Sequence, residues 1–227
     1  MKINDLIKRF ASGSCLMLAT LLVTAPTALG QGTVMEKAEF EKVVSNGNKA
    51  LEGKAYRVKV TLETFDDGKI LAAESKRSTR EFLPPNRRRD VVIFNDRGKE
   101  RKFESISIGF NSWWRKVDEP WTTSPNRIKP SDFTTAPDVV DSYKLLGKTK
   151  LSGVDVTVYE KVETHDHFGT GANATTLIHT ERYWVNDEGL FRQAVEEDEI
   201  VRTKRHIRST TVYEYDPKDM KIEAPIK

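Results

Sequence analysis

Cysteine is almost absent from this sequence, since Cys15 is the only one in 227 residues. It precedes most of an apolar stretch, and the residues before it, Ser12 to Ser14, lack the large aliphatic side chain expected upstream of a lipidated cysteine. We therefore expect no lipid anchor. The remaining chain cannot form a disulfide, so its stability has to come from packing and from sheet hydrogen bonds.

Long apolar runs are missing as well. Ser14–Ala25 is apolar, but a membrane-spanning helix needs about 20 such residues. Three basic residues precede this stretch, and the small residues of Ala28-Leu29-Gly30 follow it, an arrangement typical of a secretory signal peptide. We predict a cleaved signal peptide at 1–30, one domain at 31–227, a periplasmic location and no stable membrane anchor after cleavage. An uncleaved membrane anchor is the alternative.

Neither positive nor negative charge is in large excess. The chain has 37 basic and 34 acidic residues, a net charge of +3, and part of the basic excess lies in the predicted signal peptide. This balance gives no reason to expect a nucleic-acid partner.

Motifs of catalysis are missing too. A serine hydrolase needs its nucleophile on a tight Gly-x-Ser-x-Gly turn, and the chain has no such motif. Ser112, beside two tryptophans, is the nearest candidate and has no turn residues around it. We predict no enzyme activity and no catalytic residue, and keep a hydrolase as an alternative.

The histidines suggest a metal site only weakly. His165 and His167 are two residues apart, so on a strand they would share a face, and His179 follows. Zinc sites usually add cysteine, histidine or carboxylate ligands at set spacings, and neither His-Glu-x-x-His nor a cysteine partner occurs here. We predict no metal and no cofactor, and interpret residues 164–174 as a polar loop.

The residues that are present form one helical pattern followed by many strand patterns. Val34–Leu51 has the apolar spacing of an amphipathic helix, with a weak point at Asn46-Gly47. From Tyr56 onward the period becomes two, and Tyr183–Val185 with Leu190–Val195 forms a hairpin around a turn that ends in Gly189. About ten strands without βαβ spacing predict an α+β fold: a large curved antiparallel sheet with a helix packed on it.

Strand boundaries follow from turn residues and alternation. We expect strands at about Ile70–Phe82, Arg87–Phe94 and Arg101–Ile108, and a closing edge strand at Met220–Ala224. Residues 138–146 fit either a short helix or a strand.

Aromatic residues gather at Phe110–Trp121. Trp113 and Trp114 are adjacent, so on a strand they would face opposite ways. The cluster has two interpretations: its rings pack in the core, or they form the rim of an apolar cavity. The proline-containing stretch Thr122–Pro137 is interpreted as a surface loop, and long loops of this kind often serve as lids.

Basic residues are concentrated on two neighbouring predicted strands. Arg87, Arg88 and Arg89 lie beside Lys76, Arg77 and Arg80 of the neighbouring strand. They fit either a surface for anionic headgroups or a solvated sheet face that cross-strand carboxylates neutralise.

Several short motifs of the C-terminal half resemble the LolA-like family, which includes the carriers LolA and LolB, the mycobacterial LppX and LprG lipoproteins and the lipid-sensing half of RseB. The resemblance covers roughly Tyr143–Pro225, and the N-terminal half agrees in outline. No position matches the carrier's lid-holding arginine, and the chain lacks the lipid-attachment motif of LolB, LppX and LprG. The motifs are LGKTKLSGV (146–154), VYE (158–160), YWVN (183–186), GL (189–190), YEYD (213–216) and KIEAP (221–225).

This resemblance implies an unclosed half-barrel with an N-terminal helix and short lid helices, whose apolar concave face binds acyl chains without enzymatic activity. The expected partners are an acyl-chain lipid or lipoprotein, and an envelope receptor or inner-membrane release complex. A lipid-sensing or protein-interaction module without a transport role is the alternative. A one-residue shift in register moves every side chain of a strand to the other face of the sheet. The expected lining therefore holds only for the alternation assigned here. That lining is Tyr56, Val58, Val60, Leu62, Ile106, Ile108, Trp113, Trp114 and Trp121.

Overall fold

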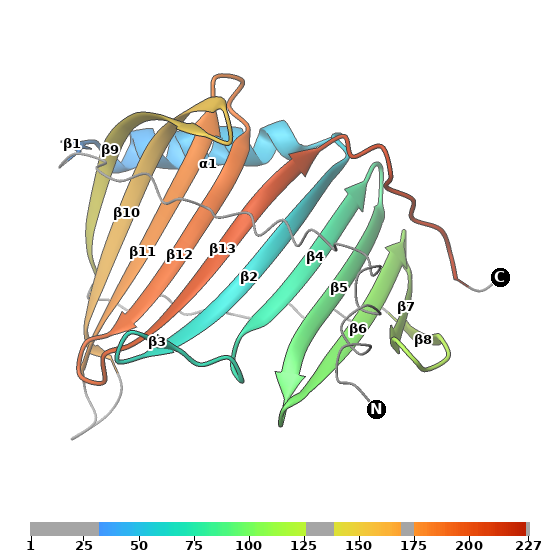
Figure 1. The fold of residues 1–227 in the computed structure, drawn as a ribbon. Coiled ribbons are helices and arrows are strands. Elements are labelled where there is room, and N and C mark those ends of the chain that lie inside the picture. Colours follow the sequence, from blue (N-terminus) through green and yellow to red (C-terminus); the bar gives the residue numbers. More distant parts are fainter. Residues whose placement is uncertain (1–31, 126–138, 169–174, 226–227) are drawn as a thin grey trace, which may run out of the picture.

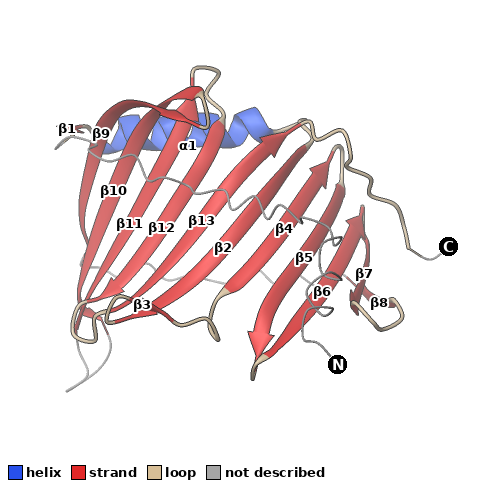
Figure 2. Cartoon of the chain, in the orientation of Figure 1, coloured by secondary structure: helices blue, strands red, loops and turns tan. Residues whose placement is uncertain are grey.

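The computed structural model describes residues 32–125, 139–168 and 175–225, so the predicted signal peptide lies outside the described residues. These residues form one 13-stranded antiparallel sheet, not closed into a barrel, and helix α1 (Lys37–Leu51) crosses one end of it (Figures 1 and 2). The order is β1-β9-β10-β11-β12-β13-β2-β4-β5-β6-β7-β8, with β3 paired to β2. The predicted α+β fold with an unclosed half-barrel is confirmed.

The strands are joined mostly by short turns, which is why consecutive strands are usually neighbours. The bounds are β1 Thr33–Val34, β2 Tyr56–Asp66, β3 Lys69–Ile70, β4 Lys76–Leu83, β5 Arg87–Asp96, β6 Lys99–Ile108, β7 Asn111–Lys116, β8 Thr122–Pro125, β9 Val139–Leu151, β10 Val154–Phe168, β11 Thr175–Asn186, β12 Phe191–Ile200 and β13 Arg205–Tyr215.

Some predicted boundaries need correction. The helix begins at Lys37 rather than Val34, because Thr33–Val34 pairs with β9 as a short strand. The predicted strand Ile70–Phe82 is two strands, β3 and β4, separated by a turn. Met220–Ala224 is not a strand at all: Ile222 is buried, but the sheet ends at β1 and β8.

The sequence left open the structure of residues 138–146 and the role of the stretch Thr122–Pro137, and the structure answers part of each. Residues 139–151 form a long strand rather than a helix. The first four residues of the predicted loop Thr122–Pro137 form β8, and the rest of that loop lies outside the described residues. Within the described chain α1 is the one helix, so the expected short lid helices are not found there, and no helix there has the length and apolarity to cross a membrane.

The sheet has two chemically different faces, which the register defines. The face that α1 covers, here called the helix face, carries Tyr143, Tyr183 and, further along the sheet, Tyr56 and Phe82. The opposite face carries a row of alternating charges and, over β10–β12, the buried apolar cluster of Val156, Val158, Trp184 and Val195. Sheet strands place successive side chains on alternate faces, so a pattern of period two separates the two surfaces.

Alternating cross-strand charges form a ladder on the opposite face. Glu81 of β4 lies 2.7 Å from Arg57 of β2 and 3.5 Å from Arg89 of β5. Glu104 of β6 continues the ladder, with carboxylate oxygens 2.7 Å from both Arg89 and Arg115. Glu81 and Glu104 are buried, and opposite charges on neighbouring strands stabilise a sheet.

This ladder bears on the two interpretations of the basic strands. Arg89 is in the ladder, Arg77 is 3.1 Å from Glu100, and Arg80 is 3.4 Å from Asp90. Most of the basic residues are therefore neutralised by cross-strand carboxylates. Arg87 is an exception, because no carboxylate lies within 4.0 Å of it among the described residues.

Replacing Glu104 with glutamine is expected to lower the free energy of unfolding by about 1–3 kcal/mol, because two guanidinium groups lose their buried carboxylate partner. Burial opposes ionisation of Glu104, but hydrogen bonds from Arg115 and Arg89 outweigh it and lower the pKa of the carboxyl. The matched control is Glu100→Gln on the same strand. Its carboxylate is exposed and paired with exposed Arg77, so we expect a change below about 0.5 kcal/mol. Urea unfolding of both variants checks this, and equal losses would contradict it.

Candidate functional site

Helix α1 contacts the sheet through its apolar stripe. The Phe40 ring lies 5.2 Å from that of Tyr143 and 6.0 Å from that of Tyr183. About two turns later, Gly47 approaches Phe191 so closely that a Cβ built on it would lie 2.2 Å from the ring. The glycine that looked like a weak point in the helical pattern is therefore the residue that lets the helix approach the sheet.

Aromatic rings continue along the helix face beyond α1. Phe191 is 5.3 Å from Tyr183 and 5.8 Å from Tyr213, measured between ring centroids. On the next strands Tyr56 stacks on Phe82 at 4.5 Å, and further on Phe94 stacks on Phe103 at 5.6 Å. Since α1 crosses only β9–β13 (Figure 1), this aromatic surface extends past the cover that the helix provides.

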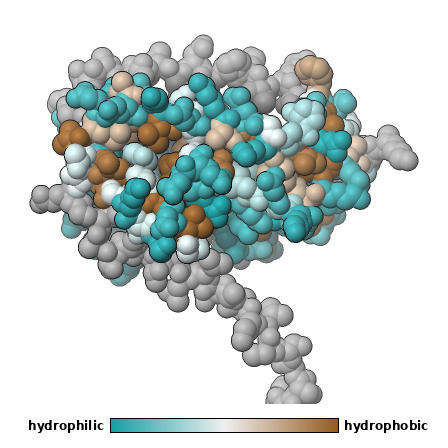
Figure 3. All heavy atoms as spheres, turned by 90° about the horizontal axis from the view of Figure 1, so that it is seen from above, coloured by the Kyte–Doolittle hydropathy of each residue, from teal (hydrophilic) through white to brown (hydrophobic). Residues whose placement is uncertain are grey.

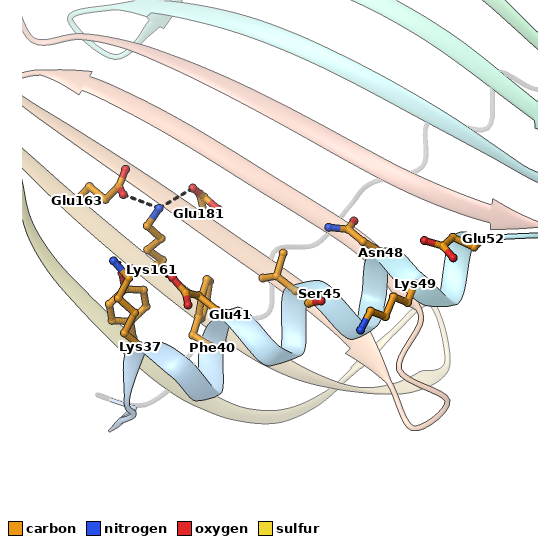
Figure 4. Close-up of a pocket in the computed structure, with 12 residues that line it drawn as sticks. Lys37, Phe40, Glu41, Ser45, Asn48, Lys49, Glu52, Lys161, Glu163 and Glu181 are labelled. Atoms are coloured by element: carbon orange, nitrogen blue, oxygen red, sulfur yellow. Dashed lines mark hydrogen bonds and ion pairs between the residues drawn. The ribbon is translucent and has the colours of Figure 1, made fainter. Parts of the chain in front are cut away.

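A groove of about 560 Å³ runs along the length of α1, from Lys37 to Glu52, between the helix and the sheet (Figure 4). We call it the proximal groove. Phe40, Val44 and Tyr143 are its apolar lining residues, and charged residues line it from both the helix and the sheet. An apolar wall joined to a few fixed polar groups is the usual composition of a ligand site.

Lys161 is at the centre of the charged residues on the sheet side. Its ammonium lies 2.5 Å from Glu163 and 3.2 Å from Glu181, as Figure 4 shows. Tyr183 donates a 2.7 Å hydrogen bond to the other oxygen of Glu181, and His179 lies between Glu181 at 3.2 Å and Asp198 at 2.7 Å. The five side chains around Lys161 thus form one connected network on the helix face.

The network shifts several proton affinities. Hydrogen bonding to Asp198, followed by that to Glu181, raises the pKa of His179 to about 10, so its imidazolium is charged at neutral pH. The hydrogen bond from His179 is the main cause that lowers the pKa of Glu181 to about 2. Burial of Lys161 opposes its charge, but its hydrogen bonds and charge interactions with Glu163 and Glu181 together outweigh this and raise the pKa of the ammonium.

Raising the pH from 6 to 9 is expected to destabilise the protein by on the order of 3 kcal/mol through His179. A folded-state pKa raised to about 10 means that the stabilisation is complete below pH 6.5 and is lost as the pH rises toward 10. Urea unfolding at both pH values measures it. In His179→Gln this pH dependence should disappear, while the variant is already less stable at pH 6. An unchanged slope in the variant would contradict the assignment.

Three residues with metal-ligating side chains lie close together on the helix face. Glu163, His179 and Glu181 can bring one ligand atom each within 4.8 Å of one another, so His179 does have carboxylate neighbours that the sequence did not suggest. His165 lies 3.8 Å from Glu163, and the side chain of His167 lies outside the described residues. The Lys161 ammonium already supplies a cation to both glutamates, so a metal ion would have to displace it. We keep the prediction of no metal.

The register divides the predicted lining residues between the two faces. Tyr56, Val58, Val60 and Leu62 lie on the helix face, because Tyr56 pairs with Tyr215 and Phe82, and the others follow by alternation. Trp114 lies on the same face, and it is 42% exposed.

The other predicted residues do not join them. Ile106 is paired with Arg89 and Trp113, which puts it on the face of the charge ladder, and Ile108 follows by alternation. Trp121 lies under the guanidinium of Arg115, 4.5 Å from its ring centre, also beside the ladder. Trp113 and Trp114 do face opposite ways, as expected. Whether any of these residues touches a ligand stays a prediction.

Sequence reasoning missed Lys161, Glu163 and Glu181. They alternate with Val158 and other apolar residues, so they had the pattern of a solvated strand face. A signal was nevertheless present, because charged residues on adjacent strands in the same register repeat in β10 and β11. The sequence could not show that α1 lies over them.

No family model matches the chain, and no curated protein matches it. Among solved structures, the lipoprotein LppX of Mycobacterium tuberculosis is similar at 14% identity and a TM-score of 0.45, covering 83% of this chain and 100% of that one. A LolA superfamily protein of Nitrosomonas europaea is similar at 11% identity and a TM-score of 0.29, covering 81% and 93%.

A putative outer membrane lipoprotein-sorting protein domain of Vibrio parahaemolyticus is similar at 12% identity and a TM-score of 0.30, covering 79% of this chain and 93% of that one. These are the kinds of protein that the sequence resembles. At TM-scores below 0.5, the half-barrel architecture rests on the strand order and register of this chain, and the function has to be argued from its own residues.

Proposed function

We propose that this chain is a periplasmic carrier or receptor that binds acyl chains on the helix face of its half-barrel. One observation carries the proposal: aromatic and aliphatic side chains continue along this face from Tyr183 through Tyr213 to Phe82, and α1 covers only part of them. A partly covered apolar groove provides burial for a hydrocarbon chain, and each buried CH₂ contributes about 0.8 kcal/mol.

The expected ligand is the acyl part of a lipid or lipoprotein. A cargo that must be released requires an open groove. One groove runs along α1, and a second lies just beyond its C-terminal end. The lining that we propose is Tyr56, Val58, Val60, Leu62 and Trp114, together with the aromatic rings beneath α1.

There are two alternatives to an acyl carrier: a hydrolase, and a lipid sensor or protein-interaction module. Hydrolysis finds no support in Ser112, which lies within strand β7 rather than on a strand-to-helix turn. We propose no enzyme activity. A lipid sensor or protein-interaction module would use the same face, and release of the ligand to an envelope receptor or an inner-membrane complex would distinguish the carrier from it.

Chain-length dependence tests the proposal. Fatty acids of 10, 12 and 14 carbons compete with a fluorescent acyl probe for the purified protein, below the concentrations at which they form micelles. If the chain is buried, each added CH₂ should tighten binding by about fourfold until the groove is filled. Absence of uptake, or an affinity independent of chain length, would contradict acyl binding.

A further inference from the structure

A second groove lies just beyond the C-terminal end of α1, where the chain passes from the helix into β2. We call it the distal groove. It encloses about 440 Å³. Leu51 of the helix, Leu83 of β4 and the stacked rings of Tyr56 and Phe82 provide its apolar wall. This wall continues the aromatic surface of the helix face, so the distal groove is one end of the proposed acyl site.

The charges around the two grooves differ in sign. All charged residues that line the distal groove are cations, namely Lys54, Arg87 and Arg88. The proximal groove instead has four glutamates against three lysines, and Lys161 is held by two of these glutamates. Of the two grooves, an anionic group would therefore meet a favourable charge only at the distal one.

The cations of the distal groove are not all engaged by carboxylates. Arg88 is bound to Asp90 at 2.6 Å and lies over the Phe82 ring. Arg87 and Lys54 have no carboxylate within 4.0 Å among the described residues. The C-terminal end of α1 carries a partial negative charge, which Lys54 offsets locally. Arg87 is the first residue of β5 and is exposed. Its pairing with Ile108 puts it on the ladder face of the strand, but it lines the groove because the groove extends over the β4–β5 turn at the strand end.

Viewed along the strands from the α1 end, the molecule shows small apolar patches set among hydrophilic side chains (Figure 3). A ligand that enters at this end therefore meets both kinds of surface. The distal groove combines them within one site, with the rings of Tyr56 and Phe82 inside and the cations at its rim.

We propose that the distal groove binds the anionic headgroup, a carboxylate or a phosphate, of the acyl ligand. Its contacts are the groove's three cations: Arg87, which has no carboxylate partner among the described residues, together with Lys54 and Arg88. This inference rests on the proposed acyl binding and adds the charge class of the ligand and its orientation. A guanidinium binds both oxyanions with two parallel hydrogen bonds. The first methylene groups of the chain then pack on Tyr56 and Phe82, and the rest of the chain extends under α1 toward the proximal groove.

Four ligands with the same twelve-carbon chain test the inference: dodecanoate, dodecyl phosphate, dodecanol and dodecylammonium. Each competes with the fluorescent acyl probe at 20 mM and at 500 mM salt. The two anions should bind about fivefold more tightly than the alcohol at low salt, the advantage expected of a partly exposed charge pair, and the ammonium should bind most weakly. A larger advantage for dodecanoate identifies a carboxylate headgroup, and one for dodecyl phosphate a phosphate.

Arg87→Gln should reduce the advantage of the anions over dodecanol to less than twofold, while dodecanol itself binds as before. The matched control is Arg97→Gln, an exposed arginine in the β5–β6 turn at the other end of the strands, which should change neither ligand. Equal affinities for all four ligands, or an unchanged anion preference in Arg87→Gln, would overturn the headgroup assignment while leaving acyl binding intact. If none of the four binds, the acyl proposal itself is wrong and this inference fails with it.

Discussion

Replacing Glu181 with glutamine is expected to lower the free energy of unfolding at pH 6 by on the order of 3 kcal/mol. Its carboxylate accepts hydrogen bonds from Tyr183, His179 and Lys161, and the pKa of Glu181 is lowered from 4.5 to about 2. The His179–Glu181 hydrogen bond contributes to the pKa shifts of both residues, so its free energy is counted only once. Urea unfolding of the variant measures the loss.

The pH dependence gives the same quantity independently. Because the folded-state pKa of Glu181 is lowered, its stabilisation is present above pH 4.5 and is lost as the pH falls toward 2. The variant should lose less stability than the parent protein between pH 5 and pH 3. Glu199→Gln, an exposed position on neighbouring β12, is the control and should change stability by less than about 0.5 kcal/mol. A loss below 1 kcal/mol in Glu181→Gln would show that water screens the network.

Replacing Gly47 with valine is expected to destabilise the protein by about 1–3 kcal/mol and to weaken acyl binding at least tenfold. The new Cβ would lie 2.2 Å from the Phe191 ring, so either the ring or α1 has to move. Helix displacement would also disturb the contact of Phe40 with Tyr143 and Tyr183. Thermal unfolding and the fluorescent probe measure the two effects.

Asn46→Val is the matched control, since it places the same side chain on an exposed position of the same helix. It should lower the free energy of unfolding by at most a few tenths of a kcal/mol and leave probe binding unchanged. If Gly47→Val were as stable as Asn46→Val, the close approach of α1 to β12 would be contradicted.

The sequence predicted the class of fold because alternation is a local property. Tyr56 to Leu62 alternate with charged and polar residues, and they form β2 as expected. The hairpin of β11 and β12 was equally clear, since Asn186 to Gly189 supply its turn. Local signals of this kind do not depend on which strands become neighbours.

The assignment of faces across the sheet was only partly predictable. Trp113 and Trp114 had to face opposite ways, because they are adjacent on one strand. Whether Ile106 shares a face with Tyr56 depends instead on the register through β4 and β5, and the pairing of Ile106 with Arg89 puts it on the opposite face. A one-residue difference at any turn between these strands reverses that result, and alternation alone does not specify the turns.

The candidate site was least predictable, because it depends on what α1 covers. Gly47 looked like a weakness in the helical pattern, whereas its role is tertiary and requires Phe191, far along the chain. Lys161 and Glu181 looked like solvated strand residues for the same reason. Packing between distant segments decides both cases, and neither leaves a local signature.

Native mass spectrometry of the protein purified from its own cell envelope, followed by organic extraction and lipid analysis, tests the central claim most directly. Acyl binding predicts a stoichiometric species that carries one or more acyl chains, and the headgroup inference predicts that this species is anionic. The Gly47→Val variant should carry much less of it. A clean apo mass for the parent protein, together with no uptake of the fluorescent probe, would contradict the account.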